Sequence, residues 1–410
     1  MFQRVRYYIF LKDVLMLALT AFGGPQAHIA HFQKVLVNKR GYLSEADLME
    51  LNSLCQVLPG PSSTQTIVGI GFKIGGPNLA YLTLLVWTLP SVIFMTILAI
   101  SLFDIQQLNW SLEFTRFIQP MAVGFISFAA YSISLKTVNT KTGIFIMIGA
   151  ALTSYFIQTP FIYPVILLLA GLIASSKYRA QPREEKDKVR IQWANFLLWI
   201  GVLVFAALLG WATRSVPEVT RPIRLFENFY RNGSLVFGGG QVLTPMLYTE
   251  FVKKDSAEIT RRPVEFTKKE YLTHDEFLTG YAIVQTLPGP VFAFSAFIGS
   301  LSMREYGTLG EIIGAFMSAA GIFLPGTFLI FFVIRFWDSL KKYRIVRASL
   351  EGITAASAGL VAAAAVILFQ PLDNTLLNFS FTIGTFCVLS FTRIPSPIII
   401  LAGLLLGFLL

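Results

Sequence analysis

The sequence predicts an all-α, multi-pass membrane protein made of two related halves. Composition, the placement of charge and an internal repeat lead to this fold class. The chain has 410 residues, of which 54% are hydrophobic and only 14% charged, and its mean hydropathy is +0.64. One soluble core could not bury so much apolar surface. Lipid is therefore expected to cover much of the chain.

Charged residues are confined to short stretches, and the runs between them are long enough to cross a bilayer, for which about 20 residues suffice. Backbone amides in hydrocarbon must be paired within the protein, and these runs lack the alternation of barrel strands, so helices are expected. The uncharged runs cover residues 74–103, 142–176, 191–213, 277–303 and 312–334.

Two motifs occur twice, which indicates an internal duplication. The sequence FGGPQ at 22–26 recurs as FGGGQ at 237–241, and QVLPGP at 56–61 recurs as QTLPGP at 285–290. The offsets are 215 and 229 residues, so the second half has extra residues between its motifs, which we place in the charged stretch 253–269. We predict an N-terminal repeat over residues 1–176 and a C-terminal repeat over residues 215–410.

Residues 177–214, between the repeats, have no counterpart in the first half. A charged linker at 177–190 is followed by the uncharged run 191–213, which predicts one extra transmembrane helix. If each half crosses the membrane an even number of times, this helix makes the second half enter from the opposite face. The sequence thus predicts an inverted repeat, and its Lys and Arg residues favour a cytoplasmic N-terminus.

Glycine and proline clusters predict broken or re-entrant helices at the GGP, GGG and PGP motifs, because freed backbone groups in a membrane must meet protein, water or a ligand. Whether these segments cross fully stays open. Four breaks at equivalent places favour one shared central site. Elsewhere, Ser44 with Asp47 and Thr273 with Glu276 have the spacing of capping boxes, which start helices.

The first PGP motif is followed by Ser62, Ser63, Thr64 and Gln65. A helix that restarts there would direct unpaired N–H groups and hydroxyls at one place, an arrangement suited to an anion. The alternative is that the hydroxyls only cap the helix and help it pack. Apolar residues follow the second PGP until Ser295, so the first half should supply most ligand contacts.

Three polar side chains near these motifs are further candidates. Gln26 and His28 follow the first glycine pair, and His28 is interpreted as a proton-sensitive or anion-contacting group or, alternatively, an interfacial histidine. His28 and His31 lack a nearby carboxylate to complete a zinc site. Lys73 either lines a cavity or pairs, or it extends to the interface. The predicted substrate-binding set is Gly24, Gln26, His28, Gly60, Ser62, Ser63, Thr64, Gln65, Lys73, Gly239, Gln241 and Gly289.

With FGGPQAH at 22–28, LPGP at 58–61, FGGGQVLTP at 237–245 and LPGP at 287–290, the chain resembles the long, two-domain form of the chromate transporter (CHR) family along nearly its whole length. The resemblance implies chromate efflux by a carrier of the prokaryotic inner membrane. Chromate is a tetrahedral dianion like sulfate, so sulfate-like anions stay open as substrates.

Other function classes fit the sequence less well. No GxxxxGK[ST] motif is present, so a secondary transporter is expected. The net charge of +10 comes from loops beside apolar runs, which argues against nucleic acid. An intramembrane enzyme would need a nucleophile with its base, or paired acids, and the sequence shows neither. A scaffold would not explain the repeated breaks. A carrier of a different small anion remains an alternative. The expected partners are the oxyanion and membrane lipid, with no cofactor, no metal and no catalytic residue, and a homodimer is left open.

Overall fold

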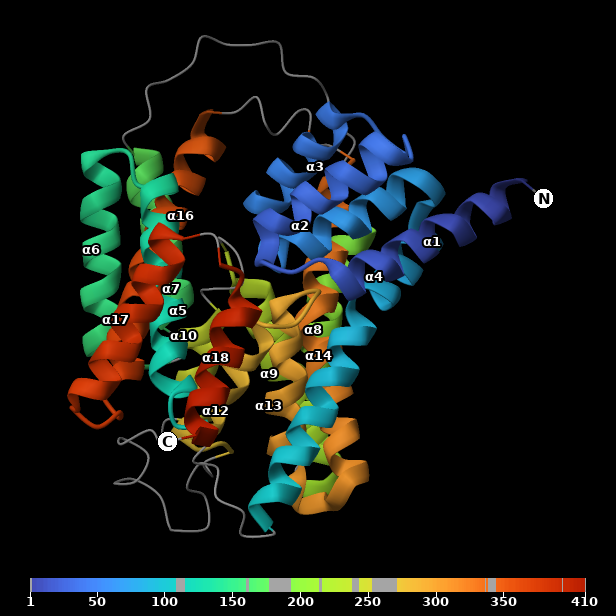
Figure 1. Ribbon diagram of the computed structural model, residues 1–410. Helices are drawn as coiled ribbons and strands as arrows, with labels where there is room; N and C mark the ends of the chain where they lie inside the picture. The colour runs from blue at the N-terminus through green and yellow to red at the C-terminus, as the bar shows by residue number, and fades with distance from the viewer. Residues whose placement is uncertain are drawn as a thin grey trace. The chain divides into compact units, whose positions relative to one another are not determined.

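The computed structural model describes residues 2–107, 115–159, 162–176, 193–213, 216–237, 243–252, 271–335, 337, 344–392 and 394–409. These residues form helices and no strand (Figure 1). They divide into two compact units. We call the first the motif unit, Met1–Leu108, Gln181–Gly240 and Val284–Tyr343, and the second the companion unit, Asn109–Ala180, Gln241–Ile283 and Arg344–Leu410. Each unit takes segments from both halves of the sequence.

The helices of the motif unit are α1 (Phe2–Thr20), α2 (Gly24–Phe32), the π-helix η1 (Gln33–Lys39), α3 (Glu45–Val57), α4 (Ser62–Gln107), α8 (Ala194–Ala212), α9 (Pro217–Leu235), the 3-10 turns η4 (Val291–Ala293) and η5 (Arg304–Tyr306), α13 (Phe294–Ser302) and α14 (Gly307–Val333). Those of the companion unit are α5 (Ile118–Thr137), α6 (Lys141–Phe156), α7 (Ile162–Ser176), α10 (Leu243–Phe251), α12 (His274–Val284), α16 (Arg344–Phe369), α17 (Leu376–Phe391) and α18 (Ser396–Leu409).

The two halves begin alike. Helices α1 and α9 have the same length, and both end just before the FGG sequence of their half. They are separated by the offset of 215 residues that separates the two FGG sequences. Helix α1 packs on α4, and α9 packs on α14. The duplication read from the motifs therefore extends to the helices around them.

Helix α4 is a hairpin rather than one straight helix. Its backbone leaves the helical region at Gly75 (φ −148°) and Gly76 (φ 74°). A side chain at Gly71 would collide with Thr83, and the indole N–H of Trp87 donates to Thr64 Oγ1 at 3.2 Å. In a straight helix, residues 71 and 83 would be about 18 Å apart. The short arm (residues 62–74) and the long arm (residues 77–107) therefore run antiparallel.

The second half repeats this hairpin with α13 as the short arm and α14 as the long arm. The chain turns at Gly307, whose φ of 69° and ψ of −175° nearly match the 74° and −166° of Gly76. A side chain at Gly299 would collide with Ser318, as would one at Gly314 with Gly299. The two arms are therefore packed almost backbone to backbone.

The two hairpins interlock, and their long arms run in opposite directions. Gln65 bonds the carbonyl of Gly326, and further along Phe72 stacks on Phe331 with ring centroids 5.0 Å apart. The short arm of α4 therefore runs parallel to the end of α14, and its own long arm runs antiparallel to α14, beside which it lies in Figure 1. Opposite directions for equivalent helices support the inverted repeat.

Five helical stretches are long and apolar enough to cross a membrane, namely Ser62–Leu102, Ile118–Leu135, Ala194–Ala212, Arg304–Val333 and Ala348–Phe369. The third is α8, at the place predicted for the linking helix. The short arm of α4 is about 20 Å long, too short to cross a hydrocarbon core of about 30 Å. The predicted class, a helical multi-pass protein with two halves and broken helices at the motifs, is confirmed.

Both predicted capping boxes are present. The Ser44 side chain accepts from the Asp47 N–H while the Asp47 carboxylate accepts from the Ser44 N–H. In the second half, the Thr273 hydroxyl accepts from the Glu276 N–H at 3.2 Å, and the Glu276 carboxylate accepts from the Thr273 N–H at 2.8 Å. These residues begin α3 and α12, as the sequence predicted.

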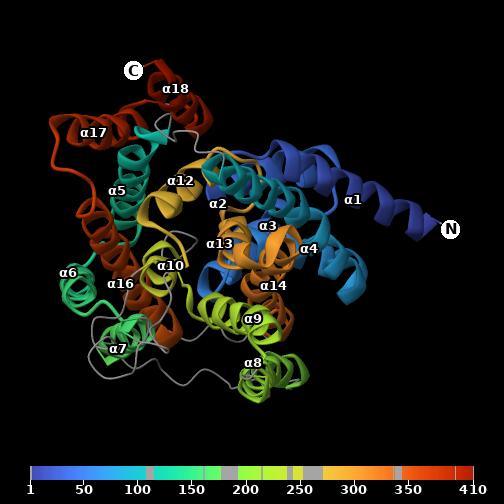
Figure 2. The same cartoon turned by 90° about the horizontal axis from the view of Figure 1, so that it is seen from below.

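The companion unit is a bundle around α16, which packs on α5, α6 and α7, as the view from below shows (Figure 2). Helix α10 is wholly buried, and its Thr249 hydroxyl lies 2.9 Å from the Tyr163 hydroxyl of α7. By sequence position α10 and α12 correspond to α2 and α3, which belong to the motif unit. The equivalent helices of the two halves therefore belong to different units.

Candidate anion site

Two reciprocal hydrogen bonds bring the broken segments of the two halves together in the motif unit. The N–H of Gly60, in the first PGP, donates to the carbonyl of Val236 at 2.7 Å, and the N–H of Gly289, in the second PGP, donates to the carbonyl of Ala21 at 3.0 Å. Val236 and Ala21 are equivalent residues just before the FGG sequences. Reciprocal contacts of this kind are what a two-fold relation between copies produces.

Glycine is required at both PGP motifs for conformation and for space. Gly60 has φ 117° and Gly289 has φ 92°, in the region that side chains disfavour. A Cβ on Gly60 would lie 3.1 Å from the Gly326 Cα, and one on Gly289 would lie 3.2 Å from the Ser91 Oγ. Gly326 and Ser91 themselves follow equivalent Leu-Pro pairs, at 324–325 and 89–90.

In the first half, the N-termini of α2 and α4 meet at a buried histidine. His28 Nδ1 lies 3.1 Å from the Ser63 Oγ. The imidazole is 1% exposed and packs edge-on against Trp87, with ring centroids 5.3 Å apart. Since Ser63 is in the first turn of α4 and His28 follows the first turn of α2, the positive ends of two helix dipoles are directed to one place.

This place is rich in hydrogen-bond donors. The first helical bond of α4 runs from the Gln65 N–H to the Pro61 carbonyl, so the N–H groups of Ser62, Ser63 and Thr64 belong to the turn that has no intrahelical acceptors. The Thr64 hydroxyl accepts from the Trp87 N–H, and that bond leaves its own proton unused. The side chains of Ser62, Ser63 and Thr64 are almost completely buried.

The His28–Ser63 pair can offer one more donor in either tautomer of the ring. If Nδ1 accepts the Ser63 hydroxyl proton, Nε2 carries a proton, and Nε2 has no hydrogen-bond partner among the described residues. If Nδ1 donates instead, the Ser63 proton is available.

The Gln65 side chain is held by two backbone carbonyls. Its amide nitrogen donates to the carbonyls of Pro59 at 2.8 Å and Gly326 at 3.1 Å. Both amide protons are used by these bonds. Gln65 therefore ties the first PGP segment to α14 of the second half and has no N–H left for an anion.

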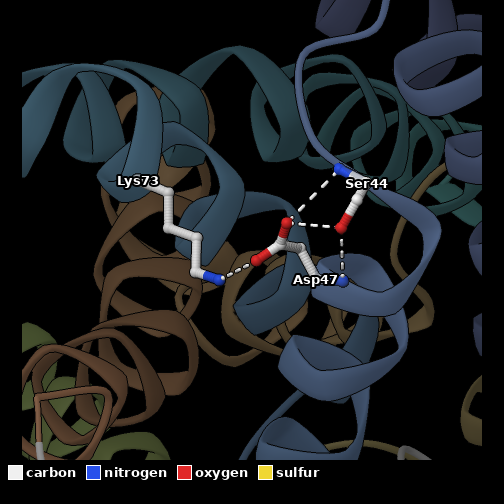
Figure 3. Close-up of polar contacts among 3 residues, drawn as sticks. All are labelled: Ser44, Asp47 and Lys73. Carbon is white, nitrogen blue, oxygen red and sulfur yellow. Dashed lines mark hydrogen bonds and ion pairs between the residues drawn. The ribbon is translucent and has the colours of Figure 1, made fainter.

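Lys73 is not gathered with Ser63 and His28. Its Nζ lies 2.9 Å from Asp47 Oδ1, and Asp47 is held in turn by Ser44 (Figure 3). A hydrogen bond from the Lys73 ammonium, and secondly one from Ser44, lower the pKa of the Asp47 carboxyl from 3.8 to about 2. Ser63 and Lys73 are about 15 Å apart along the short arm. Of its two predicted roles, Lys73 has the one in which it pairs.

The remaining predicted residues are placed as follows. Gly24 is the first residue of α2, with φ 76°, and Ser62 is the first residue of α4. Gly239, Gln241 and the side chain of Gln26 lie outside the described residues. Within the described ranges no three His, Cys, Asp or Glu side chains are grouped to hold a metal ion.

Trp87, Ser91 and Gly326 were missed by the sequence reasoning. The two Leu-Pro pairs were the available signal, because they recur with an offset of 235 residues. Nothing in the sequence marks Trp87, which approaches Thr64 only because α4 folds back on itself.

The family model for the chromate transporter matches residues 9–175 and 223–408. The chain belongs to the chromate transporter family. The two matched segments correspond to the two halves, and with the apolar helices they make the chain a multi-pass membrane transporter of this family.

Its relatives in the family are distant in sequence but match almost end to end. It is 26% identical to a probable chromate transport protein of Synechococcus elongatus, over 96% of this chain and 93% of the relative. It is 24% identical to a chromate transport protein of Cupriavidus metallidurans, over 96% and 90%, and 23% identical to an uncharacterised transporter of Methanocaldococcus jannaschii, over 97% and 92%. No solved structure matches it.

Proposed function

We propose that this chain carries chromate or a sulfate-like oxyanion out of the cell as a secondary transporter, and that the anion binds where α2 and α4 begin. The contact between His28 and Ser63 carries the proposal, because it joins two helix N-termini in a buried place. The family membership and the names of the relatives support chromate as the substrate.

A dianion that leaves water needs many strong donors, because burial of an unpaired charge is very costly. The first turn of α4 offers backbone N–H groups and the hydroxyls of Ser63 and Thr64, and α2 adds the His28 ring. Hydrogen bonds to a charged acceptor are about twice as strong as neutral ones. The site therefore favours a small anion with several oxygens over a cation or a neutral solute.

The membrane potential can drive the anion out of the cell. An inside-negative potential of 100 mV favours the exit of a dianion by about 4.6 kcal/mol, since each charge contributes about 2.3 kcal/mol. We place the protein in the inner membrane with a cytoplasmic N-terminus. The two long arms, which run in opposite directions, would expose the site alternately to each side while the glycine contacts between the halves act as the pivot.

The Ser63–His28 contact also resembles a nucleophile with its base, so an intramembrane hydrolase is the second candidate. In described residues no carboxylate hydrogen bonds to His28, and such a group normally orients the base. Covalent labelling of Ser63 by a serine-directed phosphonate would favour the enzyme. We expect none.

Flux in proteoliposomes tests the proposal directly. Purified protein with an imposed potassium-diffusion potential should move labelled chromate toward the positive side without nucleotide, and sulfate should compete. The Ser63→Ala protein should need a higher anion concentration, while Val291→Ala, altered in the first turn after the second PGP motif, should not. Strict dependence on ATP, or no anion movement by a folded protein, would overturn the proposal.

A further inference from the structure

Buried polar atoms without a partner gather on the hairpin of the second half. Within the described residues, ten buried side-chain N or O atoms have no hydrogen-bond partner, and four of them are Ser295 Oγ, Ser300 Oγ, Glu311 Oε1 and Ser318 Oγ on α13 and α14. Helix α4, the first-half hairpin, has one. Native proteins rarely leave such atoms unpaired, and each one calls for a physical explanation.

Glu311 is the ionisable member of this group. It is 2% exposed and lies in the apolar stretch Arg304–Val333, which is long enough to cross the membrane. Ionisable residues at membrane depth are costly to bury, and acidic ones often belong to proton relays in transporters. No hydrogen bond or ion pair joins Glu311 to another described residue. The equivalent residue of the first half, four positions after the turn glycine, is Ala80, so the carboxyl is not required by the hairpin itself.

The hydroxyls extend from Glu311 into the hairpin. Ser318 lies seven residues after Glu311, on the same face of α14 and about 10 Å along its axis. Ser318 packs on Gly299, the neighbour of Ser300. All of these side chains are buried. Glu311 therefore lies on the face of α14 that packs on α13 through Ser318.

Three elements packed on α14 contain charged residues, namely α4 (Lys73 and Asp104), η5 (Arg304 and Glu305) and α9 (Glu218, Arg221, Arg224, Glu227 and Arg231). Asp104, at the end of α4, and Arg304, in η5, interact with it electrostatically. On α9, Arg221 is paired with Glu305 at 3.0 Å. The other elements packed on α14 are α8, α13 and η4, and none of them contains an ionisable residue. Glu311 can therefore alternate between a neutral and a charged form without disrupting an ion pair of its own.

We propose that Glu311 is a proton-binding site that couples oxyanion movement to proton movement. The coupling rests on the proposed transport function, whereas the protonation of Glu311 does not. In this arrangement the first-half hairpin holds the anion and the second-half hairpin holds the proton.

Infrared spectroscopy tests the proton site without any transport. Spectra recorded across a pH titration of the purified protein should contain a carboxylic-acid C=O band that disappears in Glu311→Gln. The matched control Asp104→Asn, which removes the exposed neighbouring carboxyl, should keep the band. If Glu311→Gln does not fold, Glu311→Asp should shift the band. A band unchanged in whichever variant folds would assign it to another group and overturn the site.

Flux measurements test the coupling. For one proton per anion, a pH difference of one unit should change the steady-state accumulation of labelled chromate about tenfold. In Glu311→Gln this response should vanish while anion binding persists, and Asp104→Asn should respond like the original protein. Accumulation that ignores the pH difference but follows a Na⁺ gradient would overturn the coupling and leave the transport function intact. A protein that titrates at Glu311 but moves no oxyanion would overturn the transport function and leave the proton site intact.

Discussion

The hairpins of the two halves share one backbone design and differ in chemistry. Both have a short arm after a PGP motif, a turn at a glycine with positive φ, and a long arm that contains a proline. The short arm of α4 begins with Ser62, Ser63 and Thr64, whereas the second PGP leads into Val291, Phe292 and Ala293. The two halves therefore share the backbone geometry of the hairpin but differ in the side chains that follow the PGP motif.

The two hairpins also differ in the hydrogen bonding of their polar side chains. In the first, the side chains at the start of α4 are bonded to His28, Trp87 and backbone carbonyls. In the second, Glu311 and nearby hydroxyls are buried with no partner among the described residues. The hydrogen bonds of the first hairpin hold its remaining donors in a fixed geometry, whereas the unpaired groups of the second can gain and lose a proton or a ligand.

Substitution of the PGP glycines should have the largest effect, and it should be equal in the two halves. Gly60→Ala and Gly289→Ala each strain a positive φ, at about 1 to 3 kcal/mol, and also place a Cβ against a close neighbour. We expect lowered thermal stability and no transport. Gly41→Ala is the control, because Gly41 has φ 62° but no atom within 4 Å of the added Cβ. A harmless Gly60→Ala would show that the reciprocal contacts are dispensable.

Replacement of Ser63 by alanine should weaken anion binding without loss of the fold. One hydrogen bond to a charged group contributes about 1.5 to 3 kcal/mol, so affinity should fall roughly ten- to hundredfold. The backbone donors of α4 remain, and binding should persist. Calorimetric titration with chromate measures the change. Val291→Ala in the second half should leave affinity unchanged, and an equal loss in both variants would remove the proposed asymmetry.

Gln65 should affect stability rather than affinity. Gln65→Leu removes the bonds to Pro59 and Gly326, each with a net contribution of about 0.5 to 1.5 kcal/mol. Thermal unfolding in detergent should therefore begin at a lower temperature while chromate affinity changes little. A selective loss of affinity would instead mean that the Gln65 side chain contacts the anion.

The Lys73–Asp47 ion pair should have the smallest effect. Both side chains are more than one-third exposed, so the pair should contribute less than about 1 kcal/mol. Because the folded pKa of Asp47 is lowered from 3.8 to about 2, its stabilisation is present above pH 3.8 and is lost as the pH falls toward 2. Lys73→Gln should remove most of this dependence between pH 2 and 4, as followed by thermal unfolding. A large loss of transport at neutral pH would place Lys73 in the anion path.

The features that could be predicted are those that depend on residues close together in the sequence. Repeated motifs gave the two halves, the uncharged run at 191–213 gave α8, and the spacing of Ser44 and Asp47 gave a capping box. The interlocking of the hairpins could not be predicted, because the bonds of Gly60 and Gly289 join residues that are far apart in the chain. Lys73 and Gln65 were predicted to belong to the site because they follow the PGP motif closely in sequence. The length of the helix separates Lys73 from Ser63. The amide protons of Gln65 are bonded to backbone carbonyls.

Glu311 was overlooked because it is the residue just before the apolar run 312–334, where a charged residue reads as the end of a helix. In the structure α14 begins earlier, at Gly307, so Glu311 lies inside the helix and is buried. Comparison with the equivalent hairpin of the first half singles out Glu311. An equivalent turn at Gly76 is followed by Ala80, so a carboxyl at this position is a departure that the duplication does not explain.

Chromate affinity of a first-half triple variant tests the central claim most directly. Ser62, Ser63 and Thr64 are replaced together by alanine, and binding to the purified, folded protein is compared with that of the original chain and of Val291→Ala. We predict a loss of at least about tenfold in the triple variant and none in Val291→Ala, because only the first short arm offers hydroxyls. Unchanged affinity in a folded triple variant would show that these hydroxyls only cap α4 and that the anion binds elsewhere.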